Sequence, residues 1–211
     1  MIGLLHSAAA AALQPQPHDP RSLRPPLSYT DAFREQRGVI QLSPIGFVES
    51  PYKERFGTPR QPVVSTNTVG GAPQVCTVVL DSEYREALLD LDGFSHVWII
   101  SHLHLNSGWK RLVTPPRGPK RKRGLFATRA PHRPNQIGLS AVELLRVDVD
   151  GARLDVRGAD LLDGTPVLDL KPYVKGYDSF ASASAGWIDE LGEPVSSPDR
   201  LDYWPPPAHL R

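Results

Sequence analysis

The apolar residues of this chain come in short runs with the two-residue period of β-strands, and turn residues separate the runs. Six runs are expected to be strands: residues 45–49, 74–80, 96–103, 139–149, 152–158 and 167–170. Residues 82–91 are expected to form a helix, because Asp81 or Ser82 suits its N-cap and Gly93 follows its last turn. A doubly wound α/β fold would alternate strands with helices and begin with a glycine-rich turn, and the sequence shows neither. We therefore predict an all-β fold, a closed or nearly closed barrel with one short helix.

The 211 residues suit one domain of ordinary size with tails. Residues 1–40 contain an alanine run and then proline-rich sequence, which is typical of a flexible N-terminal extension. We expect the barrel over residues 41–178 and a C-terminal tail over residues 179–211, in which Trp187 and Trp204 are expected to dock. The single cysteine, Cys76, excludes an intramolecular disulfide, and the apolar stretch 8–13 is too short to cross a membrane. The cytosol is the expected compartment.

Positive charge is concentrated in one segment of the chain. From Gly93 to Val142 there is no Asp or Glu, and nine Lys and Arg residues lie between Lys110 and Arg133. The whole chain has a net charge of +1, so the remainder, with 15 basic and 23 acidic residues, stands at −8. Such localisation is typical of a protein that binds a polyanion, although a run of charges can also be a solvated flexible loop.

Residues 126–140 of this segment read Phe-Ala-Thr-Arg-Ala-Pro-His-Arg-Pro-Asn-Gln-Ile-Gly-Leu-Ser. Proline fixes φ on either side of His132 and Arg133, so a stiff backbone presents the guanidinium group. Asn135 and Gly138 supply the polar and permissive positions of a tight turn. An ordinary structural loop does not need this combination, which therefore indicates a binding or catalytic site.

Several histidines share one face of the strand expected at residues 96–103. His96, His102 and His104 have the same parity as Trp98 and Asn106, so all five side chains are expected on one side. A metal site is one interpretation, but no carboxylate lies in the surrounding segment and the chain has no cysteine cluster. The other interpretation is that His96 and His104 form hydrogen bonds to backbone near a barrel mouth.

Six sequence blocks, taken together, resemble one known family. In chain order they are SPIGFVESPYK (43–53), FGTPRQP (56–62), GFSHVWII (93–100), HLN (104–106), the 126–140 motif and DGTPVLDLKPY (163–173). Their order resembles the TrmO family, also called TsaA-like or YaeB-like, over roughly residues 41–178. The resemblance implies an all-β barrel, a homodimer and an S-adenosylmethionine-dependent methyltransferase. The implied substrate is N6 of the tRNA nucleoside threonylcarbamoyladenosine, next to the anticodon. Gln136 stands where the family usually has a proline.

The resemblance also implies contacts with S-adenosylmethionine. Gln61 has the donor and acceptor to read an adenine edge or the methionine amino-carboxylate, and Arg133 is expected to hold the carboxylate by a bidentate fork. Asp163 is expected to accept from a ribose hydroxyl or the ammonium group, the alternative being a plain β-turn at residues 163–166. The predicted cofactor contacts are Gln61, Pro62, Val63, Asn106, Ser107, Arg133, Leu144, Leu161, Leu162, Asp163 and Gly164.

Contacts with tRNA are expected from the basic segment, because phosphate contacts supply affinity without sequence choice. The predicted RNA-binding residues are Arg117, Lys120, Arg121, Lys122, Arg123 and Arg129. Choice of the modified base requires a pocket, in which Tyr173, Phe126 or Trp109 is a candidate to stack on the base.

The chemistry needs mainly positioning, because the sulfonium already activates the methyl group. Asp169, beside Lys171 and Tyr173, is the candidate base for the N6 proton, so Asp169 and Tyr173 are the predicted catalytic residues. The alternative for Asp169 is structural pairing with Lys171 or an arginine. Two rival functions stay open: a non-catalytic RNA- or nucleotide-binding barrel, and a metal-dependent hydrolase that uses the face of His96, His102 and His104.

Overall fold

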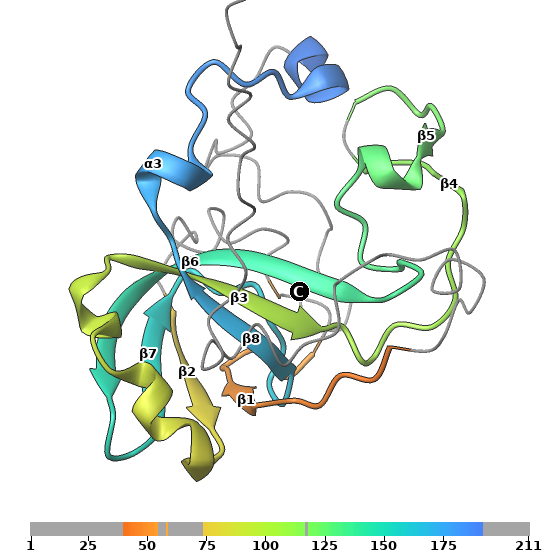
Figure 1. Ribbon diagram of the computed structural model, residues 1–211. Coiled ribbons are helices and arrows are strands. Elements are labelled where there is room, and N and C mark those ends of the chain that lie inside the picture. Colours follow the sequence, from red (N-terminus) through yellow and green to blue (C-terminus); the bar gives the residue numbers. More distant parts are fainter. Residues whose placement is uncertain (1–39, 55–57, 59–73, 117, 192–211) are drawn as a thin grey trace, which may run out of the picture. The chain divides into compact units, whose positions relative to one another are not determined.

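Six antiparallel strands close into a barrel in the order β1-β2-β7-β6-β3-β8 (Figure 1). The computed structural model describes residues 40–54, 58, 74–116 and 118–191, and from Leu42 onward they belong to one compact unit, residues 42–211. The strands are β1 (Gly46–Glu49), β2 (Val75–Leu80), β3 (His96–His102), β6 (Ile137–Asp148), β7 (Arg153–Arg157) and β8 (Pro166–Pro172). The predicted closed barrel is confirmed, and each predicted strand end lies within two residues of the observed one.

The core fills the barrel from alternate positions of its strands. Buried and exposed residues alternate along β2 and β3, as expected where one face of a strand points inward. Most of the inward residues are β-branched or leucine, which suit the pleated surface and bury apolar area. The most buried of them are Val48, Val78, Val97, Ile99, Val142, Leu154, Val156 and Val167.

The connection between β2 and β3 corrects the helix expected at residues 82–91. It holds two 3-10 helices, η2 (Ser82–Leu88) and η3 (Leu91–Gly93), instead of one continuous helix. Leu89 has a non-helical ψ of 138° and Asp90 a left-handed φ of 64°, so the helical hydrogen bonding stops between η2 and η3. The sequence predicts an apolar face of Tyr84, Ala87, Leu88 and Leu91. Leu88 is buried and Tyr84 and Leu91 pack against the core, whereas Ala87 is exposed. Sequence periodicity located this face without distinguishing the two helix types.

The remaining elements are short and had no periodic signal in the sequence. Strands β4 (Leu112–Val113) and β5 (Arg123–Gly124) form a two-stranded sheet, which η4 (Leu125–Ala127) follows directly. After the barrel come α3 (Lys175–Asp178) and η5 (Gly186–Leu191). None of the helices in the described part of the chain has the length and apolar character needed to cross a membrane.

The two ends of the barrel differ in their connections. Because neighbouring strands are antiparallel, β1, β3 and β7 end at the same rim at which β2, β6 and β8 begin. We call this end the loop rim, and its strand ends are Glu49, Val75, His102, Ile137, Arg157 and Pro166. The connections that leave it are residues 50–74, 103–136 and 158–165. All predicted cofactor contacts except Leu144 fall in these three connections.

Candidate functional site

Two stretches of the 103–136 connection are held together at the loop rim. The Leu103 amide donates to the Gln136 carbonyl (2.8 Å), and Gln136 Nε2 donates to the Asn106 carbonyl (2.6 Å). His132 Nδ1 lies 3.2 Å from the Ser107 carbonyl oxygen. The structure thus brings the predicted contacts Asn106 and Ser107 beside the loop that carries Arg133.

The backbone conformation at position 136 explains why glutamine stands there instead of proline. Its φ is 48°, in the left-handed region, whereas a proline ring fixes φ near −65°. The loop therefore has a backbone conformation here that proline cannot adopt. The amide side chain uses this conformation to join the two stretches, because it reaches the Asn106 carbonyl.

Arg133 braces its own loop and keeps part of its guanidinium group available. Its Nη1 donates to the Thr128 carbonyl (3.1 Å) and, more weakly, to the Ala130 carbonyl (3.5 Å). Its guanidinium carbon lies 5.7 Å from the ring centroid of Phe126. Within the described residues, Nε and Nη2 donate no hydrogen bond, so the edge that a carboxylate engages in a bidentate contact is open.

A carboxyl group that was not predicted from the sequence lies at the same rim. Asp160 accepts a hydrogen bond from Ser140 Oγ (2.7 Å), and Arg129 Nη2 nearby donates to the Leu139 carbonyl (2.9 Å). Burial raises the pKa of Asp160, while the Ser140 bond and the charge of Arg129 oppose the rise. Arg129, predicted to contact RNA, therefore also belongs to the rim. The sequence signal that could have identified Asp160 is its place as an acidic residue just after the strand that ends at Arg157.

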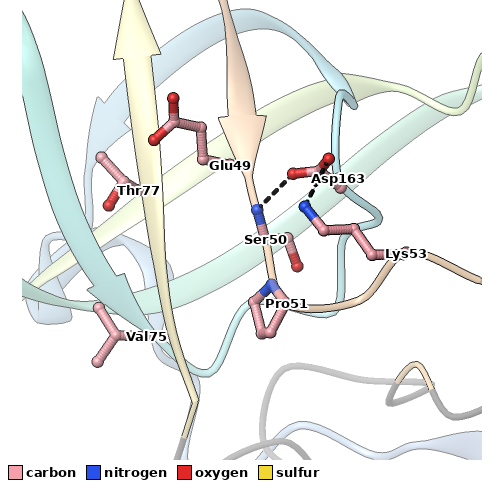
Figure 2. A pocket seen from close by; sticks show the side chains of 7 residues that line it. All are labelled: Glu49, Ser50, Pro51, Lys53, Val75, Thr77 and Asp163. Atoms are coloured by element: carbon pink, nitrogen blue, oxygen red, sulfur yellow. Dashed lines mark hydrogen bonds and ion pairs between the residues drawn. The ribbon is translucent and has the colours of Figure 1, made fainter.

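Asp163 joins the β7–β8 connection to the end of β1 (Figure 2). One carboxylate oxygen accepts from the Ser50 amide (2.9 Å), and the other pairs with Lys53 Nζ (2.7 Å). The bond from Lys53 lowers the pKa of Asp163. An open depression of about 520 Å³ adjoins this group, lined by Glu49, Ser50, Pro51, Lys53, Val75, Thr77 and Asp163.

The segment around Asp163 is also a β-turn, as its alternative interpretation required. The Thr165 amide donates to the Leu162 carbonyl (3.1 Å), which places the turn at residues 162–165, one residue earlier than expected. Gly164 has φ of 72°, a conformation that favours glycine. Leu161 is buried in the core, so only its backbone faces the rim. Turn and contact roles are therefore compatible for Asp163.

Among the residues that the structure describes, the buried polar side chains lie at the loop rim. In the described residues the buried polar side chains are Ser50, Ser101, Ser140 and Thr165, and each lies within three residues of a loop-rim strand end. The hydroxyls of Ser101 and Tyr52 are buried and have no hydrogen-bond partner there. Because a buried polar group without a partner is costly, this end of the barrel has unused hydrogen-bonding capacity.

Three predicted site residues do not join the groups that meet at the loop rim. Leu144 lies well along β6, where its amide donates to the Ser95 carbonyl (2.9 Å) just before β3 begins, and its side chain packs against the core, so the structure gives no support to its predicted cofactor contact. Asp169 points outward from β8 and pairs with Lys171 (2.8 Å), which is the structural role considered as its alternative.

Tyr173 lies at the opposite end of the barrel. Its ring centroid is 5.7 Å from that of Trp98 and 6.0 Å from that of His96, which begins β3. Within one chain, Tyr173 is therefore separated from the loop rim by the length of β8 (Pro166–Pro172). Neither Asp169 nor Tyr173 joins the residues that the loop rim brings together.

The prediction that the histidines share one face of the strand is wrong beyond His102. Strand β3 ends there, and the chain turns, with the His104 amide donating to the His102 carbonyl (2.8 Å) and the Asn106 amide to the Leu103 carbonyl (3.0 Å). The two-residue parity therefore does not extend to His104 or Asn106. Over residues 40–54, 58, 74–116 and 118–191, no three His, Cys, Asp or Glu side chains are grouped closely enough to hold a metal ion.

The basic segment divides into free and engaged side chains. Lys120, Arg121 and Lys122 are exposed and form no ion pair with the rest of the described chain. Arg123 is only 18% exposed, lies 3.6 Å from Glu190 and stacks on Trp187, 5.1 Å from the ring centroid. Three of the predicted RNA contacts are thus available to a ligand, whereas Arg123 serves as an anchor.

The expected docking of Trp187 is confirmed by its hydrogen bond to the Ala127 carbonyl (2.8 Å). Four groups of predictions fall outside the described residues: the cofactor contacts Gln61, Pro62 and Val63, the RNA contact Arg117, the docking of Trp204 and the nature of residues 1–39.

Known proteins that are similar to this chain include tRNA methyltransferases and S-adenosyl-L-methionine-binding proteins. The mouse protein named tRNA (adenine(37)-N6)-methyltransferase is 40% identical over 149 residues, which are 68% of this chain and 33% of that protein. A probable S-adenosyl-L-methionine-binding protein of Pyrococcus abyssi is 41% identical over 152 residues, 72% of this chain and 78% of that protein. The crystal structure of TrmO from Pseudomonas aeruginosa matches with 39% identity and a TM-score of 0.56, covering 71% of this chain and 62% of that one.

This chain therefore spans about a third of the length of the mouse relative, but most of the archaeal one. Residues 47–179, which include the barrel and the connections of its loop rim, match the family of the tRNA-methyltransferase O N-terminal domain. That match covers more than half of the chain and agrees with the fold and with the solved relative. The chain belongs to the tRNA-methyltransferase O N-terminal domain family.

Proposed function

We propose that this chain is an S-adenosylmethionine-dependent methyltransferase that methylates N6 of adenine 37 in tRNA. Relatives that are about 40% identical carry names for this activity or for S-adenosylmethionine binding. The observation that carries the proposal is structural: the connections that hold the cofactor contacts implied by the family all leave one rim of the barrel. We further propose the threonylcarbamoyl-bearing adenosine as the natural substrate and a homodimer as the working form, on the family resemblance alone.

The side chains at the loop rim fit the proposed cofactor. The amide of Asn106, the hydroxyl of Ser107 and the free edge of Arg133 supply donors and acceptors of the kinds that an adenosyl group and an amino acid require. The partnerless hydroxyls of Ser101 and Tyr52 add unused hydrogen-bonding capacity at the same end. Apolar contact is available from Leu162.

When bound, S-adenosylmethionine supplies a methyl group that its sulfonium has already activated, so the protein contributes mainly positioning. Arg133 is suited to orient a carboxylate through its Nε–Nη2 edge, because Nη1 is fixed by the Thr128 carbonyl. The Gln136 bridge to Asn106 holds the two walls of the site at a fixed separation. We assign no catalytic role to Asp169 or Tyr173, because Asp169 points outward and pairs with Lys171, and Tyr173 lies at the opposite end of the barrel.

The substrate is a polyanion, and the free cations Lys120, Arg121 and Lys122 are suited to its phosphates. They lie in the same connection between β3 and β6 as the proposed cofactor contacts. Phosphate contacts therefore place the tRNA on the connection from which the methyl donor is held. This arrangement favours a methyltransferase over a metal-dependent hydrolase, since the described residues offer no metal-ligand cluster.

The test has a binding arm and a transfer arm. Calorimetry with S-adenosylhomocysteine, the demethylated product, is expected to show saturable binding, and labelled S-adenosylmethionine is expected to methylate tRNA at position 37. Transfer to tRNA with and without the threonylcarbamoyl group identifies the preferred base. Binding of tRNA without any binding of S-adenosylhomocysteine would instead support the non-catalytic RNA-binding barrel. Light scattering of the purified protein tests the homodimer.

A further inference from the structure

Phe126 is held in an exposed position by a backbone that is fixed on both sides. Its side chain is 77% exposed, whereas the preceding Leu125 is buried. The Leu125 amide donates to the Arg111 carbonyl (2.9 Å), and Thr128 Oγ1 donates to the Leu125 carbonyl (2.8 Å). Single exposed apolar residues are common on proteins and need no explanation. Here, however, the surrounding contacts hold an aromatic ring out of the core instead of letting it fold in.

The ring lies next to a cation whose position is also fixed. The guanidinium carbon of Arg133 is 5.7 Å from the Phe126 centroid, and Nη1 of Arg133 donates to the Thr128 carbonyl. No acidic residue occurs between Gly93 and Val142, so nothing on this segment neutralises the site. A rigid aromatic surface flanked by an arginine is the arrangement that proteins use to stack unpaired bases of RNA.

The two other aromatic candidates lack this combination. Tyr173 packs against Trp98 at the opposite end of the barrel. Trp109 is 49% exposed and has no ring or cation contact within the described residues. Among the three aromatic residues considered from the sequence, only Phe126 is exposed, backbone-fixed and adjacent to a proposed cofactor contact.

We infer that Phe126 is the stacking platform for an unpaired base of the tRNA, in the first instance the adenine to be methylated. This inference rests on the proposed function for the identity of the base. Arg133 connects the two ligands: its guanidinium carbon lies 5.7 Å from the centre of the Phe126 ring, Nη1 is held by the Thr128 carbonyl, and the Nε–Nη2 edge is open to the methyl donor. A base stacked on Phe126 therefore lies beside the group that orients the cofactor. The binding energy of the base thus contributes to alignment for transfer.

The test uses the full chain and an anticodon stem-loop RNA with 2-aminopurine, a fluorescent adenine analogue, at position 37. Stacking on Phe126 is expected to change the 2-aminopurine emission when the wild-type protein binds. Phe126→Leu is expected to abolish this change at saturating protein and to weaken RNA binding by about 5- to 150-fold, the range for loss of one stacked base. Phe126→Trp is expected to retain both properties.

Phe180→Leu is the matched control, because Phe180 is 74% exposed and is changed in the same way. It is expected to leave RNA affinity and emission unchanged. The inference is overturned if Phe126→Leu binds the stem-loop with wild-type affinity and emission, or if its main effect is on the association of two copies of the chain. These outcomes are measured by RNA binding and by light scattering, both without the cofactor. They therefore stay distinct from a failure of the proposed function, which would appear as a wild-type protein that does not bind S-adenosylhomocysteine.

Discussion

The two ends of the barrel are built from the same six strands and have opposite characters. At the loop rim, serine and threonine side chains enter the interior and long connections leave the strands. At the other end, the β6–β7 connection is the short turn at residues 149–152, and the buried residues are apolar: Leu80, Leu88, Val97, Ala152 and Leu154. The burial that stabilises the fold and the polar groups available to a ligand are therefore separated along the barrel axis.

Among substitutions that affect one end of the barrel and not the other, Leu88→Ala is expected to have the largest effect, a loss of stability. Leu88 is 2% exposed and covers the apolar end through η2, so its truncation leaves a cavity. The free energy of unfolding is expected to fall by about 2–5 kcal/mol, as for other buried leucines. Chemical denaturation measures this loss, and the affinity of the folded protein for S-adenosylhomocysteine is expected to stay unchanged. Leu89→Ala, at the neighbouring residue, which is 61% exposed, is the matched control.

Arg133→Lys is expected to give the reverse pattern at the loop rim. Lysine keeps the charge but lacks the planar fork, so the affinity for S-adenosylhomocysteine is expected to fall by about 1.5–3 kcal/mol, measured by calorimetry. Thermal stability is expected to change little, because Arg133 braces only its own loop. Arg146→Lys, at a side chain 69% exposed, is the control. Normal binding by Arg133→Lys would remove Arg133 from the cofactor site.

A smaller and salt-dependent effect is expected from removing the three free cations of the basic segment. Replacing Lys120, Arg121 and Lys122 by Ala is expected to weaken tRNA binding and to lower the slope of log affinity against log salt by about 2. Affinity for S-adenosylhomocysteine is expected to stay normal. A control with Arg85, Arg146 and Arg153 replaced by Ala removes the same charge from outside the 103–136 connection. Equal slopes for the two variants would mean that Lys120, Arg121 and Lys122 form only a solvated surface.

The smallest effect concerns pH and the Asp163 carboxylate. Its pKa lies below the ordinary value of 3.8 because of Lys53 and the Ser50 amide. The stabilising contribution of this group is therefore complete above pH 3.8 and is lost as the pH falls through the lower pKa of the folded state. Asp163→Asn is expected to remove this part of the acid dependence, measured by thermal denaturation at a series of pH values. An unchanged acid profile would show that the link between β1 and the β7–β8 connection carries no pH-dependent stability.

Much of this fold could be predicted from the sequence because alternation of apolar residues reports directly on which face of a strand is buried. The runs at residues 74–80 and 96–103 are clear cases, since β2 and β3 alternate along almost their whole length. The break in the helix after Leu88 was not predictable in the same way. It depends on a left-handed φ at Asp90, which the hydrophobic period does not encode.

The site was predictable only in part, for a related reason. The proline-flanked arginine marked the loop of Arg133, but the partners of that loop come from elsewhere in the chain. Asp160 meets Ser140 only because β6 and β7 are neighbours in the barrel. His104 leaves the histidine face because β3 ends at His102, a boundary that parity alone does not supply. Contacts between distant segments depend on strand order and register, which a single sequence does not display.

The central claim is that ligand binding is confined to the loop rim, and hydrogen exchange with and without S-adenosylhomocysteine tests it most directly. Saturating ligand is expected to slow amide exchange in residues 103–107, 128–136 and 160–164, which lie in the connections that leave the loop rim. The opposite end, residues 82–93 and 149–152, is expected to show no change in exchange. Protection at residues 82–93 or 149–152 instead, or no protection anywhere at a concentration shown to saturate binding, would contradict the account.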